Sequence, residues 1–335
     1  MKRIAVIGAG GIARSVHLPS LMAISDIHVC AVCDLYIERA ESAAAGFNAK
    51  CYDNYHTMLE REKPDGVFVL VQPDQSYRIV LDCMRFGADV FCEKPAGITL
   101  FQLESLAKAQ QECGTVLQIG FNRRYIPLVR AVVEKMKALG GPIVQVGGSF
   151  FKNGDASFYS GCASALECDV IHVADLLCWF AGSEAQRVKA LSGRVNSDVD
   201  NGWNAVLQFE NGVLGTIRSN YQTGGRTHGF ELHSPLASAY INLGFGTAAC
   251  EADMIYFGGQ KSFSLASTGT QEEHIEHFDG RIIAGSGEYY RYYGYYDEDS
   301  AFVDSMKSRE APESDIQSAI RAMRLTEAIM ADCKG

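Results

Sequence analysis

The 335-residue sequence has few of the features that mark membrane or nucleic-acid-binding proteins. Its apolar runs all fall well short of the ~20 residues that a membrane-spanning helix requires. Lysine and arginine number 30 against 40 acidic residues, so the net charge is −10, and no basic stripe is present. A chain of this charge is a poor ligand for nucleic acid. We therefore expect no membrane and no nucleic acid as partners.

The cysteine usage does not suit a disulfide framework. The 11 cysteines are odd in number and scattered through apolar runs, which indicates reduced thiols and a cytoplasmic protein. Cys30 and Cys33 form a CxxC pair, but in a strand they point to opposite faces and cannot clip one metal. The histidines also lack metal-ligand spacing, and the stretch 272–277 is predicted to be a solvated polar loop. We expect no metal.

A strand, a glycine turn and a helix start open the chain. The apolar run at 2–7 predicts a buried strand, and the sequence GAGGIA follows it at 8–13. Gly8 permits a tight turn, Gly10 leaves room for a pyrophosphate, and Ala13 lets the helix pack closely on the strand. The N–H groups at the helix start then attract the phosphates. The residues expected to hold the adenine half of a dinucleotide are Gly8, Gly10, Gly11, Ile12 and Asp34.

Asp34 ends the second apolar run, which extends from Ile27 to Cys33. A carboxylate there accepts hydrogen bonds from the adenosine ribose and repels a 2′-phosphate, so we expect NAD rather than NADP. The alternative is that Asp34 only caps the next helix, at 37–47. Arg39 follows nearby and partly offsets the repulsion, so the preference for NAD need not be absolute.

The pattern along the chain predicts two domains, 1–122 and 123–335, which the length allows. The first alternates strand and helix, as a doubly wound parallel α/β sheet of the Rossmann type requires. Its predicted strands are 2–7, 27–33, 66–71, 88–92 and 115–119. Its predicted helices are 12–22, 35–46, 55–61, 75–86 and 99–112.

The second domain is predicted to be α+β with a largely antiparallel sheet. Asn211-Gly212 joins two of its strands as a hairpin, because both residues tolerate positive φ. The predicted strands are 143–151, 188–195, 203–209, 213–221, 230–234, 238–243 and 254–257. The predicted helices are 167–180, 299–306 and 313–331.

The fourth predicted strand ends in Glu93-Lys94-Pro95. In a doubly wound sheet the carboxyl ends of the strands face the ligand crevice, so Lys94 is expected at the nicotinamide end of the cofactor. Its ammonium can hydrogen-bond a substrate oxygen and stabilise developing alkoxide charge. Glu93 and Gln72, which follows the third strand, are expected nearby. The alternative is a surface lysine after an edge strand.

A predicted helix carries Asp169, His172 and Asp175 in an otherwise apolar sequence. Helical spacing brings the three within about one turn, where carboxylates can orient the ring and favour its charged form. Such a histidine suits proton transfer. The alternative is a core histidine whose neighbours satisfy it. Six tyrosines at 289–296 present a similar choice, and we favour packing or a subunit interface over a sugar-binding pocket.

The glycine turn, the Glu93-Lys94-Pro95 tripeptide and His172-x-x-Asp175 occur in an order that resembles the glucose–fructose oxidoreductase / inositol dehydrogenase / rhizopine-catabolism (Gfo/Idh/MocA) family. The resemblance covers almost the whole chain. It implies a Rossmann domain, and a second domain for substrate binding whose open sheet forms homo-oligomers. It also implies a nicotinamide cofactor and sugar-like or polyol substrates. The family's active-site lysine and histidine correspond to Lys94 and His172, and Pro95 is expected to be cis.

Two departures from the family pattern stand out. Cys168 occupies the position where the family commonly has an Asp, and Asp169 comes one residue later, which on an α-helix rotates the carboxylate by about 100°. Gln72-Pro73-Asp74 stands where Thr-Pro-Asn is common. These changes favour a divergent subgroup with its own substrate.

We predict an NAD(H)-dependent oxidoreductase acting on a secondary alcohol or ketone. Its catalytic residues are expected to be His172 as acid–base, Lys94, and Asp169. Two alternatives remain: a sensor that binds the dinucleotide without turnover, and a lyase or hydrolase that uses NAD transiently.

Overall fold

The computed structural model describes residues 1–158, 161, 163–244, 250–257 and 273–334. The chain divides into two compact units. Unit 1 comprises residues 1–125 and 288–323, and unit 2 comprises residues 126–287 and 324–335. The boundary expected at residue 122 lies close to the end of the first segment, but residues 288–323 belong with the N-terminal unit rather than with the second domain.

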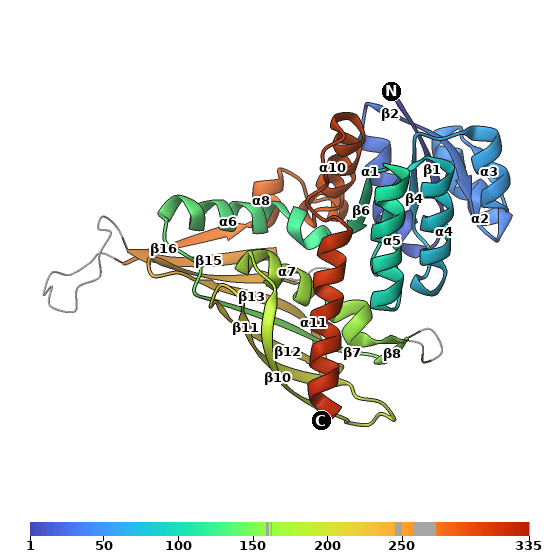
Figure 1. Cartoon of the computed structure of the whole chain (residues 1–335). Helices are drawn as coiled ribbons and strands as arrows, with labels where there is room; N and C mark the ends of the chain where they lie inside the picture. Colours follow the sequence, from blue (N-terminus) through green and yellow to red (C-terminus); the bar gives the residue numbers. More distant parts are fainter. Residues whose placement is uncertain (159–160, 162, 245–249, 258–272, 335) are drawn as a thin grey trace, which may run out of the picture. The chain divides into compact units, whose positions relative to one another are not determined.

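Unit 1 is built on a six-stranded parallel sheet in the order β3-β2-β1-β4-β5-β6 (Figure 1). Strands β2 and β3 lie on one side of β1, and β4, β5 and β6 lie on the other. This order is that of doubly wound dinucleotide-binding folds, which confirms the predicted fold class. The three-residue β3 was too short to be recognised in the sequence. The strands are β1 (Lys2–Ile7), β2 (Ile27–Cys33), β3 (Lys50–Tyr52), β4 (Gly66–Val69), β5 (Asp89–Glu93) and β6 (Leu117–Gly120).

Apart from a short helix at Tyr289–Tyr292 that was not predicted, the helices of unit 1 follow the predicted ranges to within a few residues. Side-chain caps fix two of their starts: Asn54 accepts the N–H of Thr57, and Thr99 accepts that of Gln102. The first helix departs from the regular form, because a π-helical segment at Ala13–His17 precedes α1. The α-helices are α1 (Leu18–Ala23), α2 (Ile37–Ala44), α3 (Tyr55–Glu62), α4 (Pro73–Phe86), α5 (Leu100–Cys113), α9 (Tyr289–Tyr292) and α10 (Tyr295–Ser308).

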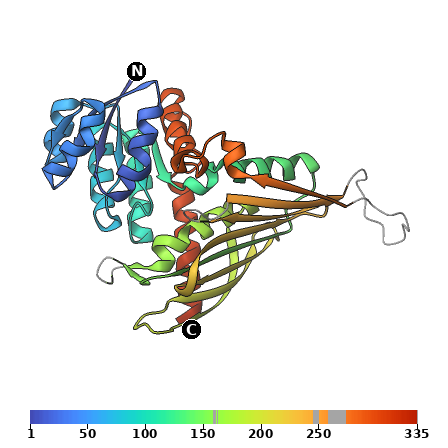
Figure 2. The ribbon, with the colours of Figure 1, turned by 180° about the vertical axis from the view of Figure 1, so that it is seen from behind.

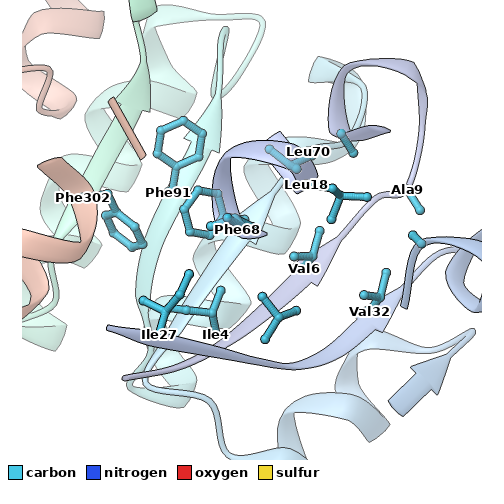
Figure 3. Close-up of a cluster of buried hydrophobic side chains, with 14 of the residues drawn as sticks. Ile4, Val6, Ala9, Leu18, Ile27, Val32, Phe68, Leu70, Phe91 and Phe302 are labelled. Atoms are coloured by element: carbon cyan, nitrogen blue, oxygen red, sulfur yellow. The ribbon is translucent and has the colours of Figure 1, made fainter. Parts of the chain in front are cut away.

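Helix α10 belongs to unit 1 because its apolar face completes the core of the parallel sheet. Phe302 packs edge-on against Phe68, with ring centroids 5.3 Å apart, and Phe68 stacks on Phe91 at 4.8 Å (Figure 3). Val303 and Met306 are fully buried in the same cluster. Burying side chains of this size contributes roughly 1.5–3 kcal/mol each, which explains why a segment so late in the sequence packs on the first sheet.

The tyrosine-rich stretch also packs within unit 1. Tyr292, Tyr293 and Tyr295 are buried, and Tyr289 stacks on Tyr293 with ring centroids 4.8 Å apart. Packing, one of the two roles favoured from the sequence, is therefore what the described residues do.

Unit 2 contains an eight-stranded sheet in the order β10-β11-β12-β7-β13-β14-β15-β16. All neighbours are antiparallel except β12 and β7, so the predicted largely antiparallel sheet is confirmed. The strands are β7 (Gln145–Asn153), β10 (Ala185–Gly193), β11 (Gly202–Phe209), β12 (Leu214–Asn220), β13 (Gln222–His233), β14 (Ala237–Leu243), β15 (Cys250–Phe257) and β16 (Glu273–Asp279). A small separate pair is formed by β8 (Ser157–Phe158) and β9 (Ala163–Ser164).

Two local predictions in this sheet can be compared with the structure. The hairpin at Asn211-Gly212 is present between β11 and β12, although only Gly212 adopts positive φ, at 88°. The polar loop expected at 272–277 is wrong: residues 273–277 lie in β16, paired antiparallel with β15, and Glu272 lies outside the described residues. Exposure alternates along β16, with Glu273, Ile275 and His277 exposed and the residues between them partly buried, which is the period of a strand with one open face.

The sheet of unit 2 has one covered and one open face. Helix α6 (Pro127–Leu139) packs along β14 and β15, and α7 (Ile171–Ala181) packs on β7 and β12. Burial alternates along β14, as expected for a sheet covered on one side. Figure 2 shows the strands of the unit 2 sheet from behind. Unit 2 also contains α8 (Gly280–Ala284) and the last part of α11 (Ile316–Lys334). No helix in the described part of the chain combines the length and apolar character needed to cross a bilayer.

Candidate functional site

The glycine turn after β1 has the backbone geometry that a dinucleotide site needs. Gly8 has φ of +97°, and a Cβ there would lie 2.5 Å from the carbonyl oxygen of Leu70, so only glycine fits. Nothing lies within 4 Å of a Cβ built on Gly10 or Gly11. Ala13 is fully buried, as close packing of the first helix requires. The space in front of the turn is therefore open to a ligand, and the helix N–H groups begin there.

Asp34 is tied to this turn. Its Oδ2 accepts the N–H of Ala9 at 2.8 Å, and its Oδ1 accepts the N–H of Tyr36 at 3.0 Å. The N-cap residue of α2 is Tyr36, so Asp34 is not the N-cap of that helix. Each carboxylate oxygen accepts more than one hydrogen bond, so Asp34 can bind a hydroxyl as well. Arg39, expected to offset its charge, lies over the ring of Tyr36 at 4.4 Å.

The other predicted cofactor residues follow strands adjacent to β1. Gln72 is the N-cap of α4 and follows β4 closely, whereas Glu93 is the last residue of β5 and Lys94 comes next. Since β1, β4 and β5 are consecutive in a parallel sheet, these residues share the carboxyl edge with the glycine turn. The bond between Lys94 and Pro95 is cis, as the resemblance implied.

His17 is a residue of this region that the sequence reasoning missed. It is fully buried in the π-helical segment, and Nδ1 lies 2.9 Å from Asp299 Oδ1 while Nε2 lies 3.1 Å from Glu93 Oε1. The rings of Phe91 and Tyr295 pack against the imidazole edge-on, with centroids 5.3 and 5.5 Å away. In the sequence, His17 stands in a His-Leu-Pro tripeptide shortly after the glycine turn, and nothing near it indicates a partner for the ring.

The electrostatics of this cluster are those of a buried imidazolium between carboxylates. Burial alone would lower the pKa of His17, but Asp299 and Glu93 outweigh it and raise that pKa to about 10. Burial would raise the pKa of Glu93, but the hydrogen bond and charge of His17 lower it below its ordinary value. Glu298 is also fully buried, and desolvation raises the pKa of its carboxyl well above the usual range.

In unit 2, His172 and Asp175 lie buried on α7. The helix approaches the sheet closely because Gly148 in β7 has no side chain: a Cβ there would clash with Val173. The apolar residues of α7 thus hold the helix against the sheet, and His172 is carried on a rigid element.

Asp169 lies in a π-helical segment, Leu166–Val170, rather than in regular α-helix as predicted. The 100° rotation expected for a one-residue shift therefore does not apply there, because π-helix has a wider turn. Its Oδ2 lies 2.6 Å from Lys152 Nζ and accepts the hydroxyl of Tyr221 at 3.0 Å. The Lys152 ammonium also lies over the Tyr221 ring, at 4.7 Å. Burial, reinforced by Asp169, raises the pKa of Tyr221.

The glycine turn and Asp34 have the chemistry of a dinucleotide site. Among the described residues, no group of three or more His, Cys, Asp or Glu side chains is arranged to hold a metal ion. Cys30 and Cys33 are both buried free thiols within β2. By contrast, the open space at Gly10 and Gly11 and the carboxylate of Asp34 fit a dinucleotide.

The fold and the turn define a dinucleotide-binding protein of the Rossmann class. Residues 2–121 match a family model described as "Oxidoreductase family, NAD-binding Rossmann fold", and residues 165–239 match the "GFO/IDH/MocA C-terminal domain". The chain belongs to the GFO/IDH/MocA family of oxidoreductases, as the sequence motifs indicated.

Named relatives match parts of the chain. An inositol 2-dehydrogenase/D-chiro-inositol 3-dehydrogenase of Lacticaseibacillus casei is 31% identical over 59% of this chain and 58% of its own length. A D-glucoside 3-dehydrogenase of Escherichia coli is 33% identical over 37% of this chain and 35% of its own length. The matches thus span less than two thirds of either relative.

Solved structures share the fold over nearly the whole chain. A dehydrogenase from Chromobacterium violaceum superposes with a TM-score of 0.86 at 22% identity, covering 99% of this chain and 95% of its own. GenD2 of gentamicin A biosynthesis, in complex with NAD, has a TM-score of 0.80 at 20% identity, covering 99% and 94%. KijD10, a 3-ketoreductase from Actinomadura kijaniata in complex with NADP, has a TM-score of 0.79 at 22% identity, covering 99% and 97%.

Proposed function

We propose that this protein is an NAD(H)-dependent oxidoreductase that transfers a hydride to or from a secondary alcohol or ketone of a sugar, polyol or related compound. The main support is structural: the glycine turn, to which Asp34 is hydrogen-bonded, lies at the same edge of the sheet as Lys94. The chain also belongs to an oxidoreductase family. The inositol and glucoside dehydrogenases among the relatives support the substrate class.

The cofactor residues have distinct roles in this proposal. The backbone of Gly8, Gly10, Gly11 and Ile12 holds the pyrophosphate, and Asp34 binds the adenosine ribose, which favours NAD over NADP. Gln72, Glu93 and Lys94 border the nicotinamide half. When bound, the nicotinamide ring supplies the acceptor or donor of the hydride.

The chain's own residues handle the oxygen and its proton. The Lys94 ammonium donates a hydrogen bond to the reacting oxygen and stabilises its negative charge as the proton leaves. His172 takes that proton during oxidation and returns it during reduction. Asp169 acts through its ion pair with Lys152 and the hydrogen bond that it accepts from Tyr221. These three side chains form a polar cluster on the same unit as His172.

A single-turnover experiment tests the proposal and its two rivals. The protein is mixed with NAD and, in turn, with inositols, glucosides and free sugars, and absorbance is followed at the reduced-nicotinamide band. A lasting rise supports the oxidoreductase. Product without lasting reduction would make it a lyase or hydrolase, and cofactor binding without product from any compound would make it a sensor.

We propose a cytoplasmic location, which the content of reduced thiols supports.

We also propose that the protein partner is a second copy of this chain, which binds through the open face of the unit 2 sheet. Strand pairing places a set of exposed apolar side chains on that face. These residues, here called the open-face set, are Leu191, Val206, Leu214, Tyr240 and Ile275. A hollow of about 300 Å³ in the sheet is lined by one member of this set, Tyr240, together with Arg218 and Glu231.

A further inference from the structure

The buried ring of His17 is bonded on both sides to acidic side chains. Nδ1 lies 2.9 Å from one oxygen of Asp299 and 3.2 Å from the other, and Nε2 lies 3.1 Å from Glu93. A carboxylate accepts hydrogen bonds, so both ring nitrogens must donate, and a ring that donates from both nitrogens is an imidazolium. The pairing geometry alone therefore indicates a positive charge at this buried position.

The second oxygen of Glu93 extends this arrangement to Lys94. Oε2 of Glu93 accepts the backbone N–H of Lys94 at 3.0 Å, while Oε1 faces His17. Both oxygens are engaged, so the carboxylate is fixed in orientation as well as in place. A chain of three contacts thus runs from Asp299 through His17 and Glu93 to the main chain of Lys94.

We propose that His17 is a positioning residue: an imidazolium at neutral pH that fixes the Glu93 carboxylate and, through it, the main chain at Lys94. The proposal rests on the proposed function, in which Lys94 acts on the substrate oxygen. Glu93 then has a defined role: it links His17 in the π-helical segment before α1 to the main chain at the end of β5, so that the two keep a fixed distance.

Gly120 on the neighbouring strand supports this role for Glu93. The two residues are paired across β5 and β6, and a Cβ on Gly120 would lie 3.2 Å from Glu93 Cδ and 3.3 Å from Oε2. Glycine at this position leaves the carboxylate the space that its two hydrogen bonds require. A methyl group there would press on the carboxylate without altering any charge.

The surrounding charges are consistent with a charged His17. Two carboxyl groups, Glu93 and Asp299, face the His17 ring; burial raises the pKa of Asp299, and the charge and hydrogen bond of His17 oppose that rise. Arg123, Lys94 and the buried Glu298 and Tyr295 are further titratable groups that act on the cluster. Within the described part of the chain, neither carboxyl oxygen of Glu298 has a hydrogen-bond partner, and burial raises the pKa of that carboxyl, which favours its neutral form. His17 is thus a cation that contacts both carboxylates directly.

The charge of His17 can be measured without any assumption about activity. Nitrogen-15 spectra of the imidazole side chains, with the His17 signals assigned by their loss in His17→Gln, distinguish a ring with two N–H groups from a ring with one. We expect two N–H groups on His17 at pH 8 in the full chain. A single N–H at that pH would overturn the imidazolium, whatever the enzyme does.

A matched pair of variants tests the positioning role. Glutamine places an amide where Nε2 lies and keeps a donor toward Glu93, whereas asparagine reaches only the Nδ1 position and keeps the contact with Asp299. We expect His17→Asn to lower kcat by about 10²-fold with cofactor affinity nearly unchanged, as for a reacting group displaced by about 1 Å. His17→Gln should retain most of kcat, and Gly120→Ala should resemble His17→Asn.

A readout at Lys94 separates failure of this inference from failure of the proposed function. The rate at which acetic anhydride modifies Lys94, followed by peptide mass spectrometry, reports its setting in the absence of turnover. We expect a severalfold change in His17→Asn and little change in His17→Gln. Equal rates in both variants and the wild type, in proteins with equal melting temperatures, would refute the positioning role even if no substrate is found.

Discussion

The Nε2 atom of His17 lies 3.1 Å from Oε1 of Glu93, across 76 positions of sequence. This bond joins the helix that follows the cofactor turn to the strand end that carries Lys94. One ion pair thus links the two parts of the candidate site on unit 1, and the His17 side chain in that pair is fully buried. The following predictions test the site piece by piece.

Replacing Lys94 by alanine should leave NADH binding nearly intact and lower turnover by about 10²–10⁴-fold, because the ammonium acts on charge that develops in the transition state. Cofactor affinity is measured by fluorescence titration and turnover by steady-state kinetics. Lys108→Ala, on the exposed side of α5, is the matched control and should behave as wild type. Near wild-type turnover in Lys94→Ala would remove the lysine from the mechanism.

Replacing Asp34 by serine should relax discrimination against NADPH, because the carboxylate that repels the 2′-phosphate is lost. The bond from the Ala9 N–H is also lost, at a cost of about 1 kcal/mol in unfolding free energy. Calorimetric titration with NADH and NADPH gives the ratio of affinities. Asp53→Ser, exposed after β3, should leave that ratio unchanged. An unchanged ratio in Asp34→Ser would mean that another residue sets the preference.

The charge of His17 should make stability depend on pH. Its pKa in the folded protein is raised from 6.5 to about 10, so the folded state binds the extra proton more tightly. The resulting stability is fully present below pH 6.5 and is lost as pH rises toward 10, with a slope of at most about 1.4 kcal/mol per pH unit. Urea unfolding across this range should show the fall in wild type, and His17→Gln should lack this component.

Glu298→Gln is the control for the pH series. Burial raises the pKa of the Glu298 carboxyl well above its ordinary value, which favours its neutral form in the folded protein. A neutral amide of the same shape should therefore leave the His17 component of the slope in place. A slope that vanished in Glu298→Gln but persisted in His17→Gln would reassign the titration to Glu298.

Asp169 and Lys152 should be energetically coupled. Their ion pair is 2.6 Å long, and each side chain is only 21% exposed, so we expect a coupling of about 0.5–3 kcal/mol in a double-mutant cycle with Asp169→Asn and Lys152→Met. The pair of Lys189 and Asp332 has the same length, but its lysine is 85% exposed, and its coupling should be at most about 1 kcal/mol. Equal coupling in the two cycles would argue against a special environment at Asp169.

The open-face set should mediate self-association. Val206→Arg places a charge on the open face, in the second strand of the sheet, and should shift the protein to monomers in sedimentation velocity. Ile282→Arg alters a more exposed apolar side chain on α8, outside the open-face set, and should leave the assembly unchanged. A monomeric wild type, or dissociation by Ile282→Arg alone, would place any interface elsewhere.

The parts of the site that local sequence determines were predictable. Gly8 and Asp34 adjoin apolar strands, so their places at the strand ends follow from the order of strand, turn and helix. His17 was not predictable, because Asp299, one of its two partners, lies 282 positions away and joins it only when α10 packs on the sheet. The contacts of Asp169 were hidden for the same reason, and a π-helical turn there carries no sequence pattern that distinguishes it from α-helix.

The return of residues 288–323 to unit 1 has a consequence for synthesis on the ribosome. The first sheet emerges early, but Phe302 and its neighbours on α10 follow only after the whole of 126–287 has been made. At about 5–20 residues per second, that interval is on the order of 10–30 seconds. During this interval Phe68 and Phe91 are not covered by Phe302. The nascent chain therefore exposes an aromatic surface, to which we expect chaperones to bind.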